Sequence, residues 1–333
     1  MKILIVGDVH WSQYSSIIRT KGNIFSTRLE NLINSVNWAE ECSKNGKCEY
    51  TIYLGDFFDK SEINSEEISA LGEINWNKDT KHIFLCGNHE MGDKFHHSSS
   101  LKLFSLVPNC EVIDKPTLRY DDENCYLIFL PYMLEENRIN LDNFCKDFES
   151  KKKYIFSHND LQIQYGQYKS VNGFTIEEIE NNCTKFFNGH LHNRKIISDK
   201  IENVGNITGQ NFSENANKHT HGVVVLDTLT NSEKFIENPY AFNFYKIDNT
   251  NITLKNNAVV SATCYENDYD DMKKFLDSHA LIYRIQVKRI ISNILTEHKN
   301  EINKIDHISK FKKYVLDNIG NDDLIKSELE LIL

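Results

Sequence analysis

The sequence predicts a layered α/β fold in which strands alternate with helices. Short apolar runs recur from the start of the chain to about residue 227, and most of them end in a polar cluster. Continuous apolar runs of this kind are typical of strands that are buried on both faces of a sheet. Between the first two runs, residues 27–42 carry apolar side chains at helical spacing, which predicts a helix there.

Seven of these runs are predicted to be strands, and five of them share one feature. The five end in polar clusters: KILIV in GDVH, YTIYL in GDFFD, KHIFLC in GNHE, KKYIF in SHND and TKFF in NGHLH. Two more runs, CYLIFLPY and GVVVLD, have no such cluster. Because α/β folds place ligand sites on the loops at strand ends, the five clusters are candidates for one shared site.

The character of the chain changes after about Pro239, and its 333 residues are enough for about two domains. We expect a main domain over residues 1–240 and a small α/β capping domain over residues 241–290. In the cap, the segment NFYKIDNTNITLKN is polar and β-like, and residues 268–289 predict a helix followed by a strand. Residues 291–333 predict helices, which either pack on their own domain or form a docking surface for a partner helix.

The composition is that of a soluble globular protein, with 40% hydrophobic and 26% charged residues. No apolar run approaches the ~20 residues of a membrane span, and the first run is too short for a signal peptide. We therefore expect no membrane association and a cytoplasmic location, in the host cytoplasm if the protein is viral. Eight scattered cysteines without a CxxC pair indicate reduced thiols, with Cys86 and Cys183 as packing residues.

The net charge of −10 argues against a broad basic footprint for nucleic acid. An anionic substrate must then be held by something other than the overall charge of the chain. Bound metal ions can do this, because they are the largest local charges in a site.

The polar clusters supply a set of residues that suits metal ions. Each cluster is a weak signal by itself, because a lone DxH or His is usually solvated or structurally satisfied. Five clusters that each close a predicted strand are a stronger signal. Three oxygen ligands and four imidazoles form a mixed set that suits Mn, Fe, Zn or Mg, and seven ligands fit two ions about 3.5–4 Å apart that share a bridging carboxylate. The candidates are Asp8, His10, Asp56, Asn88, His158, His190 and His192.

The motifs GDVH, GDFFD, GNHE, a separate His and GHLH, in this order, resemble the calcineurin-like metallophosphoesterase superfamily over roughly residues 1–227. The resemblance implies a β-sandwich of two mixed sheets flanked by helices, here with a small α/β cap and C-terminal helices. It also implies a role for each motif residue. Asp8, His10 and His192 would hold the first metal, Asn88, His158 and His190 the second, and Asp56 would bridge them.

The same resemblance assigns His89 to catalysis rather than to metal binding. His89 would face the scissile phosphate, stabilise developing charge and protonate the leaving oxygen. Glu90 either orients His89 or is structural. Asp59 is expected to be a structural cap or to support a ligand from behind, rather than to be a ligand itself.

The residues around the motifs distinguish branches of the superfamily. Its protein phosphatases have Gly after the first motif, Arg-Gly after the second and LRGNHE as the third, where this chain has Trp11, Lys60 and Cys86. The contexts YLGDFFDK and NGHLHNRK, the cap and the terminal helices are more similar to SbcD-type DNA repair nucleases, including their phage recombination relatives. The chain departs from that family in NVGNITGQNFSEN, where a Gly-Ser-Pro turn and a Gly-Glu are usual.

This resemblance implies a Mn²⁺-dependent DNA exo- or endonuclease subunit with two divalent ions. Its partners would be DNA and an SMC-like, SbcC-type coiled-coil ATPase bound through residues 291–333, in recombination and double-strand-break repair. The sequence leaves the oligomeric state undecided, and a homodimer is one alternative. The alternatives are a phosphatase or nucleotide phosphodiesterase that acts on small molecules or proteins, and a non-catalytic scaffold. Candidate phosphate contacts, each more often an ordinary surface residue, are Arg19, Lys21, Arg28, His96, His97, Arg194 and Lys195.

Overall fold

The computed structural model describes residues 1–15, 18, 21–121, 125–146, 151–165, 168–214 and 216–288. The chain forms two compact units. The first consists of Met1–Cys264 and Asp270–Gln286, and the second of Tyr265–Tyr269 and Val287–Leu333. All the candidate metal ligands belong to the first unit. The predicted partner-binding helices of residues 291–333 lie outside the described residues.

The first six-stranded sheet carries three of the predicted polar loops. Its order is β14-β13-β1-β2-β3-β4, and the four strands β1 to β4 run parallel. Parallel strands end at the same edge of a sheet, so Asp8, Asp56 and Asn88, which follow β1, β2 and β3, come to one edge. The strands are β1 (Lys2–Val6), β2 (Tyr50–Tyr53), β3 (Lys81–Leu85), β4 (Cys110–Ile113), β13 (Gly222–Asp227) and β14 (Ser232–Glu237).

The second six-stranded sheet carries the other two loops. Its order is β11-β12-β10-β7-β6-β5, with β6, β7, β10 and β12 parallel and the two outermost strands antiparallel. His158 follows β7 and His190 follows the neighbouring strand β10. The strands are β5 (Thr117–Asp121), β6 (Cys125–Leu130), β7 (Lys152–Ser157), β10 (Lys185–Asn188), β11 (Lys195–Ile196) and β12 (Ile201–Asn203).

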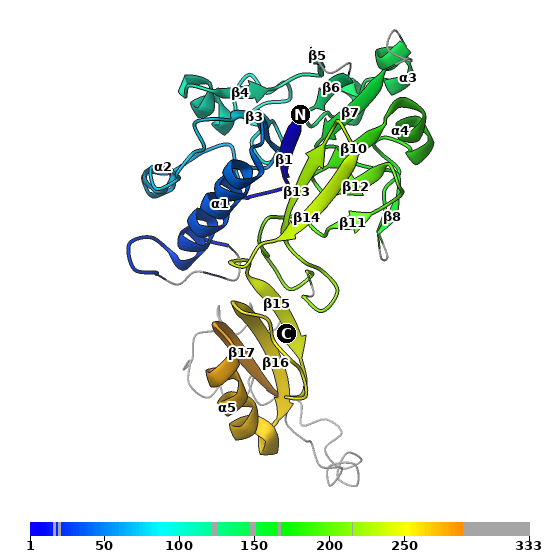
Figure 1. Cartoon of the computed structure of the whole chain (residues 1–333). Helices are drawn as coiled ribbons and strands as arrows, with labels where there is room; N and C mark the ends of the chain where they lie inside the picture. The colour runs from blue at the N-terminus through cyan, green and yellow to red at the C-terminus, as the bar shows by residue number, and fades with distance from the viewer. Residues whose placement is uncertain are drawn as a thin grey trace, which may run out of the picture. The chain divides into compact units, whose positions relative to one another are not determined.

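The two sheets pack face to face, and helices cover their outer faces (Figure 1). Alternate residues of β1 divide between two cores, because successive side chains of a strand point to opposite faces. Ile3 and Ile5 pack between the sheets, and Leu4 and Val6 pack under α1. The helices are α1 (Thr27–Gly46) and α2 (Ser65–Leu71) on one side, and α3 (Leu141–Cys145) and α4 (Ile176–Asn182) on the other. The predicted sandwich of two mixed sheets flanked by helices is confirmed.

Helix α1 begins as predicted and ends one turn later than predicted. The side chain of Ser26 caps its first turn by accepting from the Leu29 N–H, and Lys47 ends it in the left-handed region at φ 53°. The last turns bury polar groups instead of apolar ones. Glu40 accepts from the Tyr53 hydroxyl at 2.7 Å, and buried Ser43 lies in the final turn. Apolar periodicity therefore disappears before the helix does.

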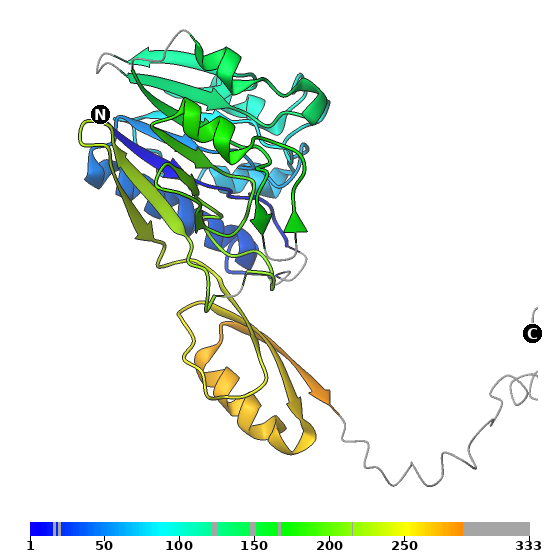
Figure 2. The same ribbon diagram turned by 90° about the vertical axis from the view of Figure 1, so that its right-hand side faces the viewer.

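Residues 243–288 build a separate three-stranded sheet with one helix. The helix α5 (Tyr269–His279) lies on one face of the sheet β15-β16-β17 (Figure 2). Its buried side chains Met272 and Leu276 belong to the same apolar cluster as residues of the sheet. The predicted helix and strand correspond to α5 and β17 (Ile282–Lys288), whereas only the first part of the β-like segment forms a strand, β15 (Asn243–Ile247). The central strand β16 (Ala258–Tyr265), parallel to β15, was not predicted.

Several shorter elements complete the described chain. They are the hairpin of β8 (Gln164–Tyr165) and β9 (Tyr168–Lys169) and the 3₁₀ turns Ser100–Leu106, Glu135–Asn137 and Glu266–Asp268. All eight cysteines are free, and Cys86 and Cys183 are buried, as expected. Within the described ranges, no helix has both the length and the apolar character needed to cross a bilayer.

Candidate metal centre

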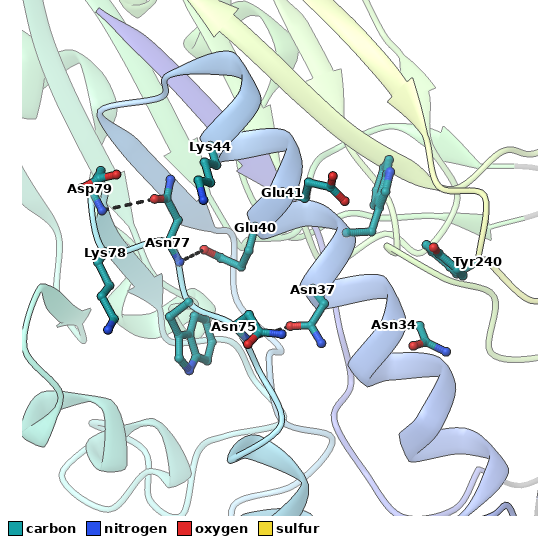
Figure 3. Close-up of a pocket in the computed structure, with 12 residues that line it drawn as sticks. Asn34, Asn37, Glu40, Glu41, Lys44, Asn75, Asn77, Lys78, Asp79 and Tyr240 are labelled. Atoms are coloured by element: carbon teal, nitrogen blue, oxygen red, sulfur yellow. Dashed lines mark hydrogen bonds between the residues drawn. The ribbon is translucent and has the colours of Figure 1, made fainter.

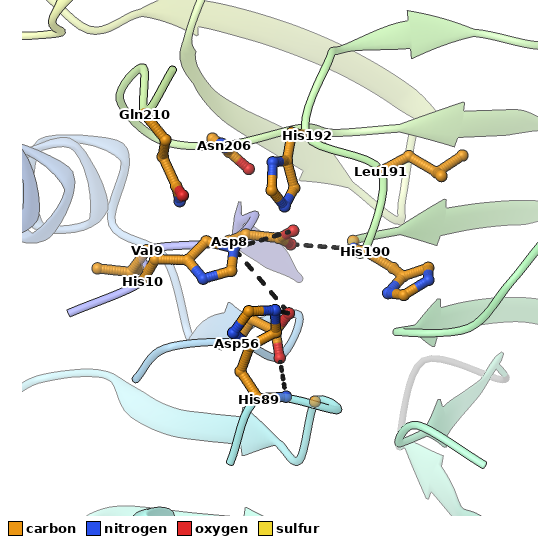
Figure 4. Close-up of polar contacts among 12 residues, drawn as sticks. Asp8, Val9, His10, Asp56, His89, His190, Leu191, His192, Asn206 and Gln210 are labelled. Atoms are coloured by element: carbon orange, nitrogen blue, oxygen red, sulfur yellow. Dashed lines mark hydrogen bonds and ion pairs between the residues drawn. The ribbon is translucent and has the colours of Figure 1, made fainter. Parts of the chain in front are cut away.

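Loops from both sheets bring the predicted metal ligands to one place (Figure 4). Asp8, His10 and His192 offer ligand atoms that lie within 4.8 Å of one another. Asp56, His158 and His190 form a second group of the same kind. The structure thus brings the predicted residues together in the two predicted groups, although they come from strands far apart in the sequence.

Asn88 and Asp56 lie where the proposed roles need them. The Asn88 side-chain oxygen is 3.2 Å from His158 Nε2 and 3.0 Å from His190 Nδ1, so the amide belongs to the second group. Asp56 Oδ2 is 3.1 Å from His158 Nε2 and 4.0 Å from His10 Nε2, which places this carboxylate between the two groups.

The first group contains two buried polar atoms without partners. Asp8 Oδ1 accepts from the His190 backbone N–H at 3.1 Å, but Asp8 Oδ2 has no hydrogen-bond partner. His10 Nδ1 donates to Asp59 Oδ1 at 3.0 Å, which leaves an unpaired lone pair on buried His10 Nε2. The two unpaired acceptors are 3.9 Å apart. A buried unpaired polar group costs about 1–3 kcal/mol, and a divalent cation between these two atoms would satisfy both. The residues therefore fit a metal.

In the second group, one histidine nitrogen and two side-chain oxygens also lie close together. His158 Nδ1 donates to the Leu54 carbonyl at 2.9 Å, so its Nε2 faces the oxygens of Asp56 and Asn88. Burial alone would lower the pKa of His158, but the Asp56 carboxylate outweighs it and raises the pKa to about 9. Without a metal, a proton on His158 supplies the positive charge that this cluster of oxygens requires.

Two carboxylates that the sequence did not single out lie behind the histidines of the second sheet. Asp160 Oδ1 is 3.3 Å from His190 Nε2, and Glu214 Oε1 is 3.6 Å from His192 Nδ1. A carboxylate behind an imidazole fixes its tautomer and its orientation, as Asp59 does for His10. The position of Asp160 two residues after His158 was a usable signal, and the Gly-Glu that the resemblance leads one to expect in NVGNITGQNFSEN was a signal for Glu214.

His89 lies at the solvent side of the centre. Its side chain is 38% exposed, and its Nδ1 donates to the Asp59 carbonyl at 2.9 Å. Its Nε2 is therefore the free nitrogen, 4.0 Å from Asp56 Oδ2. The ring lies edge-on to His10 at 4.7 Å between centroids. The unbonded nitrogen of His89 therefore lies at the exposed side of the centre.

The Glu90 carboxylate binds backbone N–H groups rather than the ring of His89. Its fully buried carboxylate accepts from the N–H groups of Asp56, Phe58 and Gly87 at 3.1, 2.9 and 2.7 Å. Of the two roles left open by the sequence, the structure supports the structural one. Glu90 fixes the loop that carries Asp56, whose φ of 48° is unusual for a residue with a side chain.

The strand β10 is followed by Gly189, a position at which a side chain would not fit. A Cβ at this position would lie 2.7 Å from Asp8 Oδ1 and 2.9 Å from His158 Nδ1. Only glycine lets the loop of the second sheet approach the ligands so closely.

The basic residues offered as phosphate contacts differ in their surroundings. Arg28 and His96 are buried rather than on the surface. Arg194 is paired with Glu202 at 2.7 Å. Arg19 lies outside the described residues, and the exposed members are Lys21, His97 and Lys195.

One further cavity lies away from the metal centre. It measures about 640 Å³ and runs between α1 and residues 75–79 (Figure 3). Its walls bond to one another, since the Asn77 N–H donates to Glu40 at 2.9 Å and the Asn75 N–H to Asn37 at 2.7 Å. No candidate metal ligand lines it.

A family model described as calcineurin-like phosphoesterase matches residues 1–194, which include all seven candidate ligands and His89. Similar solved structures include an archaeal phosphodiesterase, at 16% identity and a TM-score of 0.38, over 71% of this chain and 99% of that one. A dimetal phosphatase from Danio rerio is similar at 14% identity and a TM-score of 0.43, over 67% of this chain and 91% of the other. Comparison with curated proteins gave no match.

Replacing Glu90 should test its role in holding the Asp56 loop. In Glu90→Gln, an amide group would face backbone N–H donors, so we expect the free energy of unfolding to fall by about 1–3 kcal/mol and metal binding to weaken. Denaturant unfolding and a metal titration measure the two effects. Glu177→Gln, on the exposed face of α4, is the matched control. Unchanged stability and metal affinity in Glu90→Gln would contradict the assigned role.

Metal affinity should rise with pH. Below a pKa of about 9, a proton occupies His158 and must leave before a metal binds, so one released proton changes the apparent affinity by about tenfold per pH unit. Titrating the metal-free protein with Mn²⁺ at pH 6.5, 7.5 and 8.5 measures this dependence. An affinity that stays constant over this range would show that His158 does not exchange a proton for the metal.

Proposed function

Because the chain belongs to the calcineurin-like phosphoesterase family, we propose that it is a dinuclear-metal phosphodiesterase that cuts DNA. In this proposal the ions are Mn²⁺, and the protein is a nuclease subunit that acts in the cytoplasm, in recombination and double-strand-break repair. The observation that carries the metal chemistry is the pair of buried, unpaired acceptors on Asp8 and His10, which lie 3.9 Å apart.

The side chains that would hold the ions follow from the two groups. Asp8, His10 and His192 would hold one ion, and Asn88, His158 and His190 the other, with Asp56 between them. When bound, two such ions activate a water and neutralise the charge of a phosphoryl group. The chain itself contributes a rigid, largely buried arrangement, in which Asp59, Asp160 and Glu214 orient the imidazoles from behind.

His89 would supply the proton. Its Nδ1–H is held by the Asp59 carbonyl, so Nε2 is the atom that can give a proton to the leaving oxygen. The protonated ring would also stabilise the negative charge that develops on the phosphoryl oxygens. Its exposure allows contact with a substrate that approaches from solvent.

The small three-stranded sheet favours a macromolecular substrate. It is tied to the loop beside the metal centre, since the Gly209 N–H donates to the Phe242 carbonyl at 3.2 Å and the rings of Phe212 and Phe244 meet edge-on at 5.1 Å. A cap joined to the rim of an active site provides additional surface for a long substrate. The acidic chain would depend on a partner for much of its DNA affinity. We propose an SbcC-type coiled-coil ATPase in that role, bound through residues 291–333.

A cleavage assay on linear DNA tests the function. We expect cleavage with Mn²⁺ and none after chelation. His89→Asn should lower the rate about 10²–10⁴-fold, the range of general acid catalysis, while two ions per chain remain bound. His279→Asn, an exposed histidine of α5, is the matched control.

Other outcomes of this assay favour other functions. Intact DNA together with strong turnover of cyclic or dinucleotide substrates would favour a small-molecule phosphodiesterase. A protein that binds no metal after incubation with Mn²⁺ would be a scaffold. Full cleavage by His89→Asn in the presence of chelator would rule out the proposed mechanism.

The partner is tested separately. A chain that ends at Lys288 should lose binding to a coiled-coil ATPase of the SbcC type, because the predicted apolar helix faces are removed, and should keep its cleavage of small diesters. Pull-down of the full and the shortened chain with the same ATPase measures the difference. Equal retention of both chains would contradict the assignment of residues 291–333.

A further inference from the structure

A second, smaller cavity of about 210 Å³ lies directly beside the metal centre. Two of its lining residues, His10 and Asp59, belong to the centre itself. The cavity therefore adjoins the centre through the side chains of His10 and Asp59. Its remaining described walls are Ser12, Ser15, Arg28, Gln210 and Asn211.

Arg28 is a buried cation with unused donors. Its side chain is 1% exposed and bonds to the carbonyls of Gly209 at 3.0 Å and Val9 at 3.5 Å. Its Nε has no hydrogen-bond partner. Burial lowers the pKa of Arg28 to about 10, against the opposing effect of Glu214 and Asp59, so the group stays charged at neutral pH. A guanidinium has five N–H donors, and the described contacts use only two of them.

Gln210 places a second unused donor at the same cavity. Its buried side-chain Nε2 has no hydrogen-bond partner, although its backbone N–H donates to Glu214 at 2.8 Å. Figure 4 shows the Gln210 side chain directed from its loop toward the group around Asp8 and His10.

These donors require a ligand with oxygen acceptors. A cation is disfavoured by the charge of Arg28, and a neutral apolar group would leave the donors unpaired. The one carboxylate of the cavity, Asp59, is already occupied by the Nδ1–H of His10 at 3.0 Å. A guanidinium beside an amide donor suits the oxygens of a phosphate, which it can contact through two N–H groups.

We propose that this cavity binds the phosphate adjacent to the scissile phosphate of a polynucleotide, through Arg28 and Gln210. The inference rests on the proposed function and narrows its substrate class. A substrate with a second phosphate one nucleotide from the reacting one gains this contact, whereas a simple monoester or diester does not. Arg28 thus acts in substrate recognition from inside the protein rather than as part of a basic surface.

Two pairs of small substrates test the inference with the full chain and Mn²⁺. One pair is the p-nitrophenyl ester of thymidine 5′-phosphate with and without a 3′-phosphate. The other is the p-nitrophenyl ester of thymidine 3′-phosphate with and without a 5′-phosphate. We expect kcat/KM to be at least about tenfold higher for the doubly phosphorylated member of one pair, the size of one charge-assisted contact.

Variants of the cavity residues test whether the preference for a second phosphate comes from this cavity. Arg28→Gln and Gln210→Glu should both bring the ratio within the preferred pair toward one, and Arg28→Lys should retain part of it. Arg138→Gln, a partly buried arginine on the outer side of the other sheet, should leave the ratio unchanged. If Arg28→Gln fails to fold, Gln210→Glu, which keeps the shape of the side chain, decides the question.

The results that overturn the inference differ from those that overturn the proposed function. Equal kcat/KM within both pairs, or a preference that survives in Gln210→Glu, overturns the phosphate site while leaving a working phosphodiesterase. The absence of turnover for all four substrates overturns the inference, and intact linear DNA in the cleavage assay with Mn²⁺ overturns the proposed function as well.

Discussion

Hydrogen bonds between the two sheets join the halves of the metal centre, and one of them spans 182 residues of sequence: the backbone N–H of His190 donates to Asp8 Oδ1 at 3.1 Å. It connects the loop after β10 in one sheet to the loop after β1 in the other. A second tie, from His158 Nδ1 to the Leu54 carbonyl at 2.9 Å, holds the next pair of loops in the same way. These bonds form only because the inner faces of the sheets are packed through a continuous apolar core. The positions of all the candidate ligands therefore depend on that packing, and a shift of one sheet against the other would separate both groups at once.

Electrostatics is the second constraint, because the centre buries several carboxylates in a chain of net charge −10. Glu90 accepts from three backbone N–H groups, but its burial and the nearby Asp56 carboxylate still raise its pKa to about 8. Asp8 and Asp56 are different, since they face imidazole nitrogens and Asp8 keeps an unpaired oxygen. Burying such oxygens is costly unless a cation balances them, and this is the physical reason for assigning metals here. Arg28 is the corresponding buried cation, and the nearby carboxylates of Asp59 and Glu214 oppose the effect of burial on its pKa.

Local pattern was sufficient for a layered α/β fold and for the set of candidate ligands, because each motif follows directly on a strand that apolar runs identify. The two-sheet sandwich and the division of the ligands into two groups came from the resemblance to the calcineurin-like metallophosphoesterases. It failed where the decisive contact is between distant segments. The last two turns of α1 bury Glu40 and Ser43, polar residues that the sequence alone predicts to be exposed. The strand β16 follows a polar, turn-rich stretch and was missed. Glu214 supports His192 only through the fold, and Arg28 appeared as a surface charge although it is fully buried. Burial of a polar group, unlike burial of an apolar one, has no periodic signature.

Glu214 also links the metal centre to the neighbouring cavity. One of its oxygens lies 3.6 Å from His192 Nδ1, and the other accepts from the Gln210 N–H at 2.8 Å. A single buried carboxylate thus orients a candidate ligand and the loop that carries a proposed phosphate contact. The same loop is hydrogen-bonded to the small sheet at Gly209. A substrate held by that sheet would therefore change the geometry of both the metal centre and the neighbouring cavity. Recognition of the substrate and positioning of the metals are, on this account, properties of one segment of the chain, residues 205–214.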